Sequence, residues 1–235
     1  DASYYISNSP TELDDLTTVE WMLSQGVDVI NTSWSVHPSG PGDGSSPLPW
    51  DILNTVNYAI GNGVTWVTAS GNEANGGHWY GHWYDPENDG WHNFQGSDRR
   101  NCAYFSAGST INSYLRWEGS WGGESNDFDL ILSKYESGTY TLISESDDPQ
   151  VGLQTHYPKE VLVYSVNSSG IYCLQIREWS AQVTPDWLQL FVSGSGSALD
   201  YSDPDRSLES PADSANPGLL TVGATAWHNS STIED

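Results

Sequence analysis

Apolar residues in the first part of the chain recur first at helical spacing and then in short continuous runs. Two helices are predicted, over about 11–25 and 50–62, each with apolar residues three or four positions apart and a glycine near its end. Each helix is followed by a run of apolar and β-branched residues, 27–33 and 64–69, which is typical of buried strands. Alternating helices and strands predict parallel strands joined by right-handed crossovers. We therefore expect a doubly wound α/β unit with a parallel sheet.

The middle of the chain has a different pattern, with apolar residues at every second position and turns rich in Gly, Ser, Asn and Pro. The predicted strands are 102–106, 111–117, 128–132, 139–144, 161–166, 171–176 and 187–192. Short strands without an intervening helix predict an antiparallel β-sandwich. A later strand, 218–224, has the buried character of the first part. We therefore expect the sandwich to be an insertion that interrupts the α/β domain.

These patterns predict four consecutive segments. The α/β part begins with 1–77 and resumes with 197–235, and the sandwich occupies 98–196. Between them, 78–97 is rich in aromatic and acidic residues and is expected to be a loop.

The composition limits the partners. Seven Lys and Arg oppose 31 Asp and Glu, a formal net charge of −24, which argues against nucleic acid and against an anionic membrane. No run of about eighteen apolar residues occurs, so no membrane span is predicted. Twelve Trp and 13 Tyr supply ample apolar surface for a core, and we expect a folded extracellular protein.

The chain has two cysteines, Cys102 and Cys173, without the close spacing of a zinc site. One disulfide between two strands, crossing the sandwich, is the preferred interpretation. Two free buried thiols are the alternative.

The loop 78–97 contains a possible calcium site. Asp85, Glu87 and Asp89 alternate and are followed by Gly90, as in the first half of a calcium-binding loop. The twelfth position is Gly96 rather than a bidentate glutamate, so a solvated acidic turn is the alternative. The sequence predicts no other cofactor.

The end of the strand 64–69 is the strongest candidate for a functional site. Gly71 permits a backbone conformation closed to most residues, and Asn72 then presents a side-chain amide. Open α/β sheets bind ligands at the carboxyl ends of their strands. An ordinary polar turn is the alternative interpretation.

Several short stretches, in their order along the chain, resemble the middle of a subtilisin-like serine protease. They are 26–33, 59–64, 69–73, 211–213 and 220–224. More loosely, 121–130 together with the strand from Gly170 resembles the pre-peptidase C-terminal type of domain, which some subtilases carry as an insertion. The resemblance implies an incomplete subtilisin-like α/β domain with an inserted β-sandwich.

The resemblance also implies roles for individual residues. Asn72 would donate its side-chain amide to the oxyanion of the tetrahedral intermediate. The family usually has glycine at the position of Ser35. The segments that would line the substrate cleft are Ser33, Trp34 and Ser35 on one side and Ala69, Ser70 and Gly71 on the other.

The catalytic triad motifs of the family are not found in this sequence, which contains no His-Gly-Thr and no Gly-Thr-Ser-x-Ala. We therefore expect an internal segment of a secreted subtilisin-like endopeptidase that lacks the catalytic Asp, His and Ser and is inactive alone. Its partners would be the remaining parts of the protease domain and a peptide or protein substrate.

Two other functions fit the sequence. One is a non-catalytic surface or filament protein built on a subtilase-derived scaffold, which would use the sandwich for self-association. The other is a glycan-binding module in which Trp117 and Trp121 are exposed platforms, although packing in the core is the more common use of such residues. The flanking sequence would discriminate among the three.

Overall fold

The computed structural model describes residues 3–8, 12–38 and 40–224, and for 12–14 it describes the backbone. The chain forms two compact units. The first unit consists of 1–71 and 208–235, and the second consists of 72–207. The second unit is therefore inserted in sequence between the two segments of the first.

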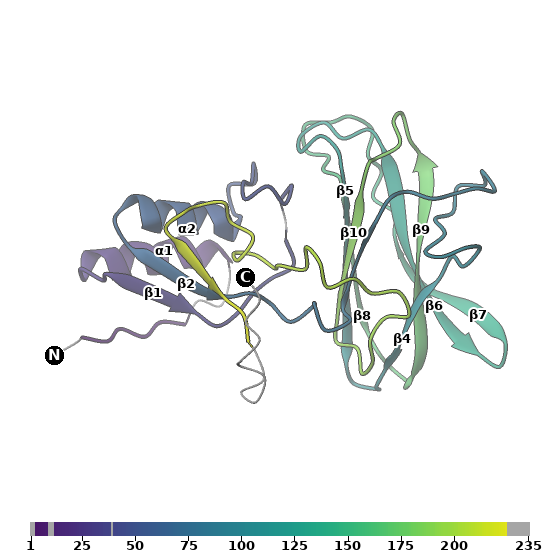
Figure 1. The fold of residues 1–235 in the computed structure, drawn as a ribbon, viewed down its shortest axis with the longest axis horizontal. Helices are drawn as coiled ribbons and strands as arrows, with labels where there is room; N and C mark the ends of the chain where they lie inside the picture. Colours follow the sequence, from purple (N-terminus) through teal and green to yellow (C-terminus); the bar gives the residue numbers. More distant parts are fainter. Residues whose placement is uncertain (1–2, 9–11, 39, 225–235) are drawn as a thin grey trace. The chain divides into compact units, whose positions relative to one another are not determined.

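The first unit contains a three-stranded parallel sheet in the order β1-β2-β11 (Figure 1). Its strands are β1 (Val29–Thr32), β2 (Thr65–Ala69) and β11 (Leu219–Val222), and its helices are α1 (Glu12–Ser24) and α2 (Ile52–Gly61). Asp51 caps α2 by accepting a 2.9 Å hydrogen bond from the backbone N–H of Leu53. Gly26, at φ +73°, follows α1 in a conformation that favours glycine.

Both helices pack on the same face of this sheet (Figure 1). Ile30 and Trp66 are register partners on that face, and they share a buried cluster with Val19 of α1 and Val56 of α2. Val29, expected to be buried, is 55% exposed on the opposite face. The prediction of a doubly wound sheet is therefore not met by the described residues. The strands lie side by side in the same order as in the chain, β1, β2 and β11. With this order, right-handed crossovers keep the helices on one face of the sheet.

The second unit contains two antiparallel sheets of four strands each. One sheet has the order β3-β10-β5-β8, with β3 (His78–Gly81), β10 (Leu188–Ser193), β5 (Thr110–Trp117) and β8 (Lys159–Ser165). The other has the order β4-β9-β6-β7, with β4 (Asn101–Phe105), β9 (Gly170–Ser180), β6 (Asp127–Glu136) and β7 (Thr139–Ser146).

Side chains from both sheets form one core. Leu115 and Trp117 of β5 lie in the same buried cluster as Phe128 and Leu130 of β6, and all four are fully buried. These core residues stand at every second position, as expected when successive side chains of a strand point to opposite faces of the sheet.

Part of the expected loop 78–97 is in fact a strand. β3 pairs with β10, and Trp79 of β3 contacts His92 and Phe94 through ring centroids 4.9 Å apart in each case. Four residues are too few to show a clear period in the sequence, and the pairing partner lies more than one hundred residues later, so the pattern missed it.

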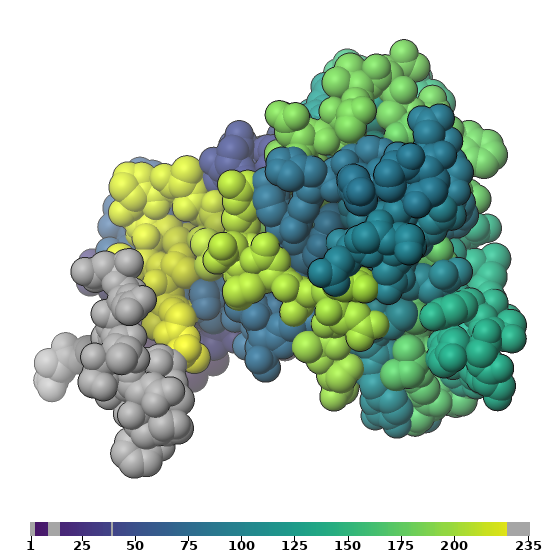
Figure 2. Space-filling view, turned by 45° about the vertical axis from the view of Figure 1, so that its right-hand side comes forward, coloured from purple at the N-terminus to yellow at the C-terminus, as the bar shows by residue number. Residues whose placement is uncertain are grey.

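The predicted segment boundaries also differ from the structure. The units divide after Gly71 and after Ser207, whereas the sequence placed the boundaries at 77 and 197. The chain that leaves the second unit first runs along its surface: Leu199 donates to Gly76 O at 2.8 Å, and Asp203 donates to His78 O at 2.8 Å. Figure 2 shows this yellow-green stretch beside blue atoms of the entering chain.

The structure contains the predicted disulfide between Cys102 and Cys173, with Cα atoms 4.0 Å apart. Its location differs from the prediction. The two cysteines are register partners on β4 and β9, so the bond joins neighbours within one sheet and does not cross the sandwich.

Among the described residues, neither helix has the length and the apolar composition needed to cross a membrane.

Candidate functional site

The carboxyl end of β2 forms a turn that the surrounding backbone fixes. After Ala69, Ser70 donates a 3.1 Å hydrogen bond to Val222 O at the end of β11. Gly71 follows at φ +98°, a conformation that would strain any residue with a Cβ. Asn72 comes next and is exposed, and its carbonyl oxygen accepts a 3.3 Å hydrogen bond from Asn75 N.

The segment that follows β1 and the turn after β2 are both hydrogen-bonded to a third segment, residues 209–210. Ser33 and Trp34 are exposed, and Trp34 is 40% accessible to solvent. Val36 and Ser210 exchange two backbone hydrogen bonds, of 3.0 and 2.9 Å, in an antiparallel bridge. Ser210 thus lies directly beside the segment predicted to bind substrate.

Glu209, immediately before this bridge, joins the two predicted substrate-binding segments. Its backbone N–H donates to Ser70 O at 3.3 Å, and its Oε2 accepts a 2.6 Å hydrogen bond from Ser35 Oγ. A Cβ built on Gly71 would lie 2.5 Å from the same oxygen. The structure therefore brings Ser35 and Gly71 together around one carboxylate.

Sequence reasoning missed Glu209. The signal was present, because an acidic residue stands two positions before the matched stretch 211–213. Its importance depends on pairings with residues more than one hundred positions earlier, and no local pattern reports those.

His37 lies near the same carboxylate, with Nε2 3.7 Å from Glu209 Oε1. Burial lowers the pKa of His37 below its usual value, and the negative charge of Glu209 opposes this effect without reversing it. The imidazole is therefore neutral near pH 7 and does not supply a positive charge.

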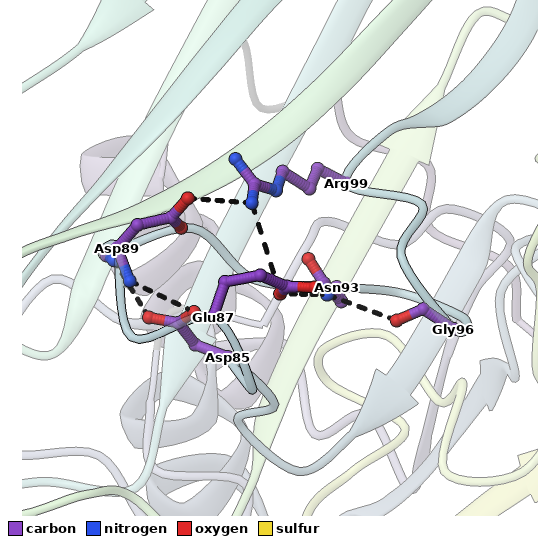
Figure 3. A network of polar contacts seen from close by, with 7 residues as sticks. Asp85, Glu87, Asp89, Asn93, Gly96 and Arg99 are labelled. Carbon is purple, nitrogen blue, oxygen red and sulfur yellow. Dashed lines mark hydrogen bonds and ion pairs between the residues drawn. The ribbon is translucent and has the colours of Figure 1, made fainter.

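The predicted calcium ligands make contacts with protein groups (Figure 3). Asp85 accepts hydrogen bonds from the backbone N–H groups of Asp89, at 3.3 Å, and Gly90, at 2.8 Å. Asp89 forms a 2.7 Å ion pair with Arg99, and Glu87 lies 3.9 Å from the same guanidinium. Glu87 also accepts a 2.8 Å hydrogen bond from Asn93, whose amide donates in addition to Gly96 O at 3.1 Å.

The three carboxylates do not converge in this arrangement. Within the described part of the chain, Asp85, Glu87 and Asp89 are not a group whose ligand atoms all lie within 4.8 Å of one another. Arg99 occupies the position between Glu87 and Asp89 that a cation would take. A bound calcium ion would therefore have to displace Arg99 from this network.

The tryptophans considered as glycan platforms are not both available. Trp117 is fully buried in the core of the second unit, so its interpretation as an exposed platform is wrong. It lies on the same face of β5 as Ile111 and Leu115, which belong to the same core cluster. Trp121 is partly buried and stacks on Tyr157, with ring centroids 5.9 Å apart.

A buried acidic group lies at one edge of the second unit. Glu160 of β8 is 1% exposed and accepts hydrogen bonds from Ser146 Oγ and, at 2.7 Å, from Gln150 Nε2. Burial, assisted by the negative charges of Asp148 and Asp129, raises the pKa of Glu160 to about 7. This group therefore titrates near neutral pH, far from the usual range of a glutamate.

Comparison with solved structures supports the fold. The Clostridium perfringens CspB protease has a TM-score of 0.58 and 13% sequence identity, with 94% of this chain and 48% of that chain aligned. This chain thus spans about half the length of the CspB protease chain. The Yersinia pseudotuberculosis-derived mitogen matches 52% of this chain and 88% of its own, at 15% identity and a TM-score of 0.33.

Comparison with protein families shows the family of the chain. Curated protein sequences give no match. The model of the subtilase family matches residues 3–230, which include most of both segments of the first unit and all of the second. The chain belongs to the subtilase family.

Proposed function

We propose that this chain is part of a subtilisin-like serine endopeptidase and supplies the oxyanion-stabilising asparagine and two walls of the substrate cleft. The catalytic Asp, His and Ser would come from other parts of the parent protein. The proposed substrate is a peptide or protein, as the family suggests.

One observation carries this proposal. The turn 69–72 follows the carboxyl end of β2, and Ser35 and Gly71 lie on either side of one carboxylate although they belong to separate segments. Open α/β sheets place ligands at such strand ends. An exposed amide at Asn72 has the chemistry needed to donate a hydrogen bond to a developing oxyanion.

We further propose that the second unit is an inserted β-sandwich of the pre-peptidase C-terminal type and that the protein acts outside the cell. The two sheets with a shared core support the first statement. The disulfide and the net charge of −24 support the second, because disulfides persist in oxidising compartments.

Asn72→Ala in the full-length parent protein tests the central proposal. The expected result is a kcat roughly a hundred- to a thousand-fold lower with little change in KM, because the amide bonds to charge that exists only in the transition state. The fold should be retained, with a stability change of at most about 1 kcal/mol, because this exposed side chain does not fill the core.

Asn75→Ala is the matched control, since it removes another exposed amide from the same turn. It should leave kcat within about two-fold of the wild type. A parent protein that cleaves peptides equally well with and without the Asn72 amide would return Asn72 to the status of a turn residue. A parent protein without peptidase activity would favour the scaffold function.

A further inference from the structure

Glu209 contacts both predicted walls of the substrate cleft. It is 5% exposed, and its Oε2 accepts the hydroxyl of Ser35 at 2.6 Å. On the other wall, the same oxygen occupies the space beside Gly71 in which a Cβ would come within 2.5 Å. The carboxylate therefore lies against one residue of each wall.

The backbone of this segment fixes that position. Glu209 N bonds to Ser70 O at 3.3 Å, and the next residue, Ser210, forms a two-bond bridge with Val36. The carboxylate is thus held from both walls, by main-chain contacts as well as by the serine hydroxyl. A side chain fixed in this way loses little conformational entropy when a ligand group binds to it.

The hydroxyl of Ser35 donates to Glu209, so the carboxylate is bonded to the segment expected to pair with the substrate backbone. The neighbouring His37 is neutral near pH 7, since burial lowers its pKa, and it adds no positive charge to the cluster.

We propose that Glu209 is a specificity residue that selects substrates with a lysine or arginine side chain on the acyl side of the scissile bond. The proposal rests on the proposed function, in which that side chain enters between the two walls. An ammonium or guanidinium group can form a charge-assisted hydrogen bond with the carboxylate, and arginine can form two. An acidic side chain would meet repulsion, and a neutral one would gain no ion pair with the carboxylate.

The test uses the full-length parent protein and fluorogenic peptides that differ at this one residue, which is Arg, Lys, Met or Glu. The wild type should cleave the Arg and Lys peptides at least ten-fold better in kcat/KM than the Met peptide, and the Glu peptide least well. Glu209→Gln keeps the volume and an acceptor for Ser35 but removes the charge. It should lower kcat/KM for the Arg peptide at least ten-fold and change the Met peptide by less than about three-fold.

Glu20→Gln on α1 is the matched control, because it removes one exposed negative charge from the same unit without touching either wall. Its Arg-to-Met ratio should equal that of the wild type. Cleavage of all four peptides at similar rates, or a ratio unchanged in Glu209→Gln, would overturn the specificity role while leaving the peptidase function standing. Absence of cleavage of any peptide would instead reject the peptidase function.

A second measurement needs no substitution, since a change at a buried residue can impair folding. Cleavage of the Met peptide by the wild type should be inhibited competitively by benzamidine, an arginine-like cation, at concentrations at which neutral benzamide has no effect. Equal inhibition by the two compounds would contradict the assignment of Glu209.

Discussion

The buried carboxyl group of Glu160 makes the stability of the second unit depend on pH in an unusual direction. A glutamate ordinarily has a pKa of 4.5, and burial raises that of Glu160 to about 7. A raised pKa means that the folded unit favours the protonated side chain. Its contribution to stability is therefore fully present below pH 4.5 and is lost as the pH rises through 7. Many proteins show the opposite trend at acidic pH.

The size of the effect follows from the difference between the two pKa values. One pKa unit corresponds to about 1.4 kcal/mol, so the free energy of unfolding should fall by on the order of 3 kcal/mol between pH 4.5 and pH 8. Glu160→Gln removes this penalty, because glutamine is neutral at every pH. Its side-chain oxygen can still accept from Gln150, and its amide nitrogen can donate to the Ser146 hydroxyl, from which the glutamate oxygen accepts in the wild type.

Urea denaturation at a series of pH values from 4.5 to 8.5 measures the effect. The β-sheet circular dichroism signal suits the purpose, since eight of the eleven strands in the described residues belong to the second unit. The advantage of Glu160→Gln over the wild type should be near zero at pH 4.5 and grow to roughly 3 kcal/mol at pH 8.5. Glu145→Gln, an exposed glutamate on β7, is the control and should show no such growth. Parallel stability curves for wild type and Glu160→Gln would refute the reasoning.

Two further predictions concern the aromatic and acidic segment of the second unit. Burial lowers the pKa of His92 to about 4, so its ring should remain neutral in NMR titrations down to about pH 4. The stability that His92 contributes above pH 6.5 should be lost as the pH falls toward 4. A titration midpoint near pH 6.5 would contradict this prediction. Calcium, if it binds at Asp85 and Asp89, has to displace Arg99, so millimolar calcium should raise the melting temperature of Arg99→Gln more than that of the wild type. An unchanged melting temperature in both proteins would exclude calcium at this site.

The sequence predicted the helices and strands that are determined by residues close to one another along the chain. All seven expected strands of the middle region correspond to strands of the second unit. A pattern of period two follows from the alternation of side chains between the two faces of a strand. The ends of both helices were also predictable, since Gly26 and Gly63 adopt positive φ values of 73° and 90°. These features depend on residues within a few positions of one another.

Features that depend on distant partners were not predictable in the same way. Val29 is exposed, although its sequence is that of a buried strand. β3 was missed because its pairing with β10 defines it. The sequence left a calcium site and a solvated acidic turn as alternatives for the acidic loop, and it does not show that Arg99 folds back onto Glu87 and Asp89.

The insertion explains how Glu209 can reach Gly71 although the whole second unit lies between them in sequence. Within the second unit, the entering and leaving chains are neighbours, because Val192 and Leu199 donate to the carbonyl oxygens of Gly77 and Gly76 at 2.7 and 2.8 Å. Once the second unit has folded, its two ends are thus close together, and the effective loop between β2 and β11 is short. The entropic cost of closing that loop rises with its length, so the folded insertion reduces the cost of pairing the two strands. We therefore expect the contact between Glu209 and Ser35 to form only after the inserted sheets have assembled.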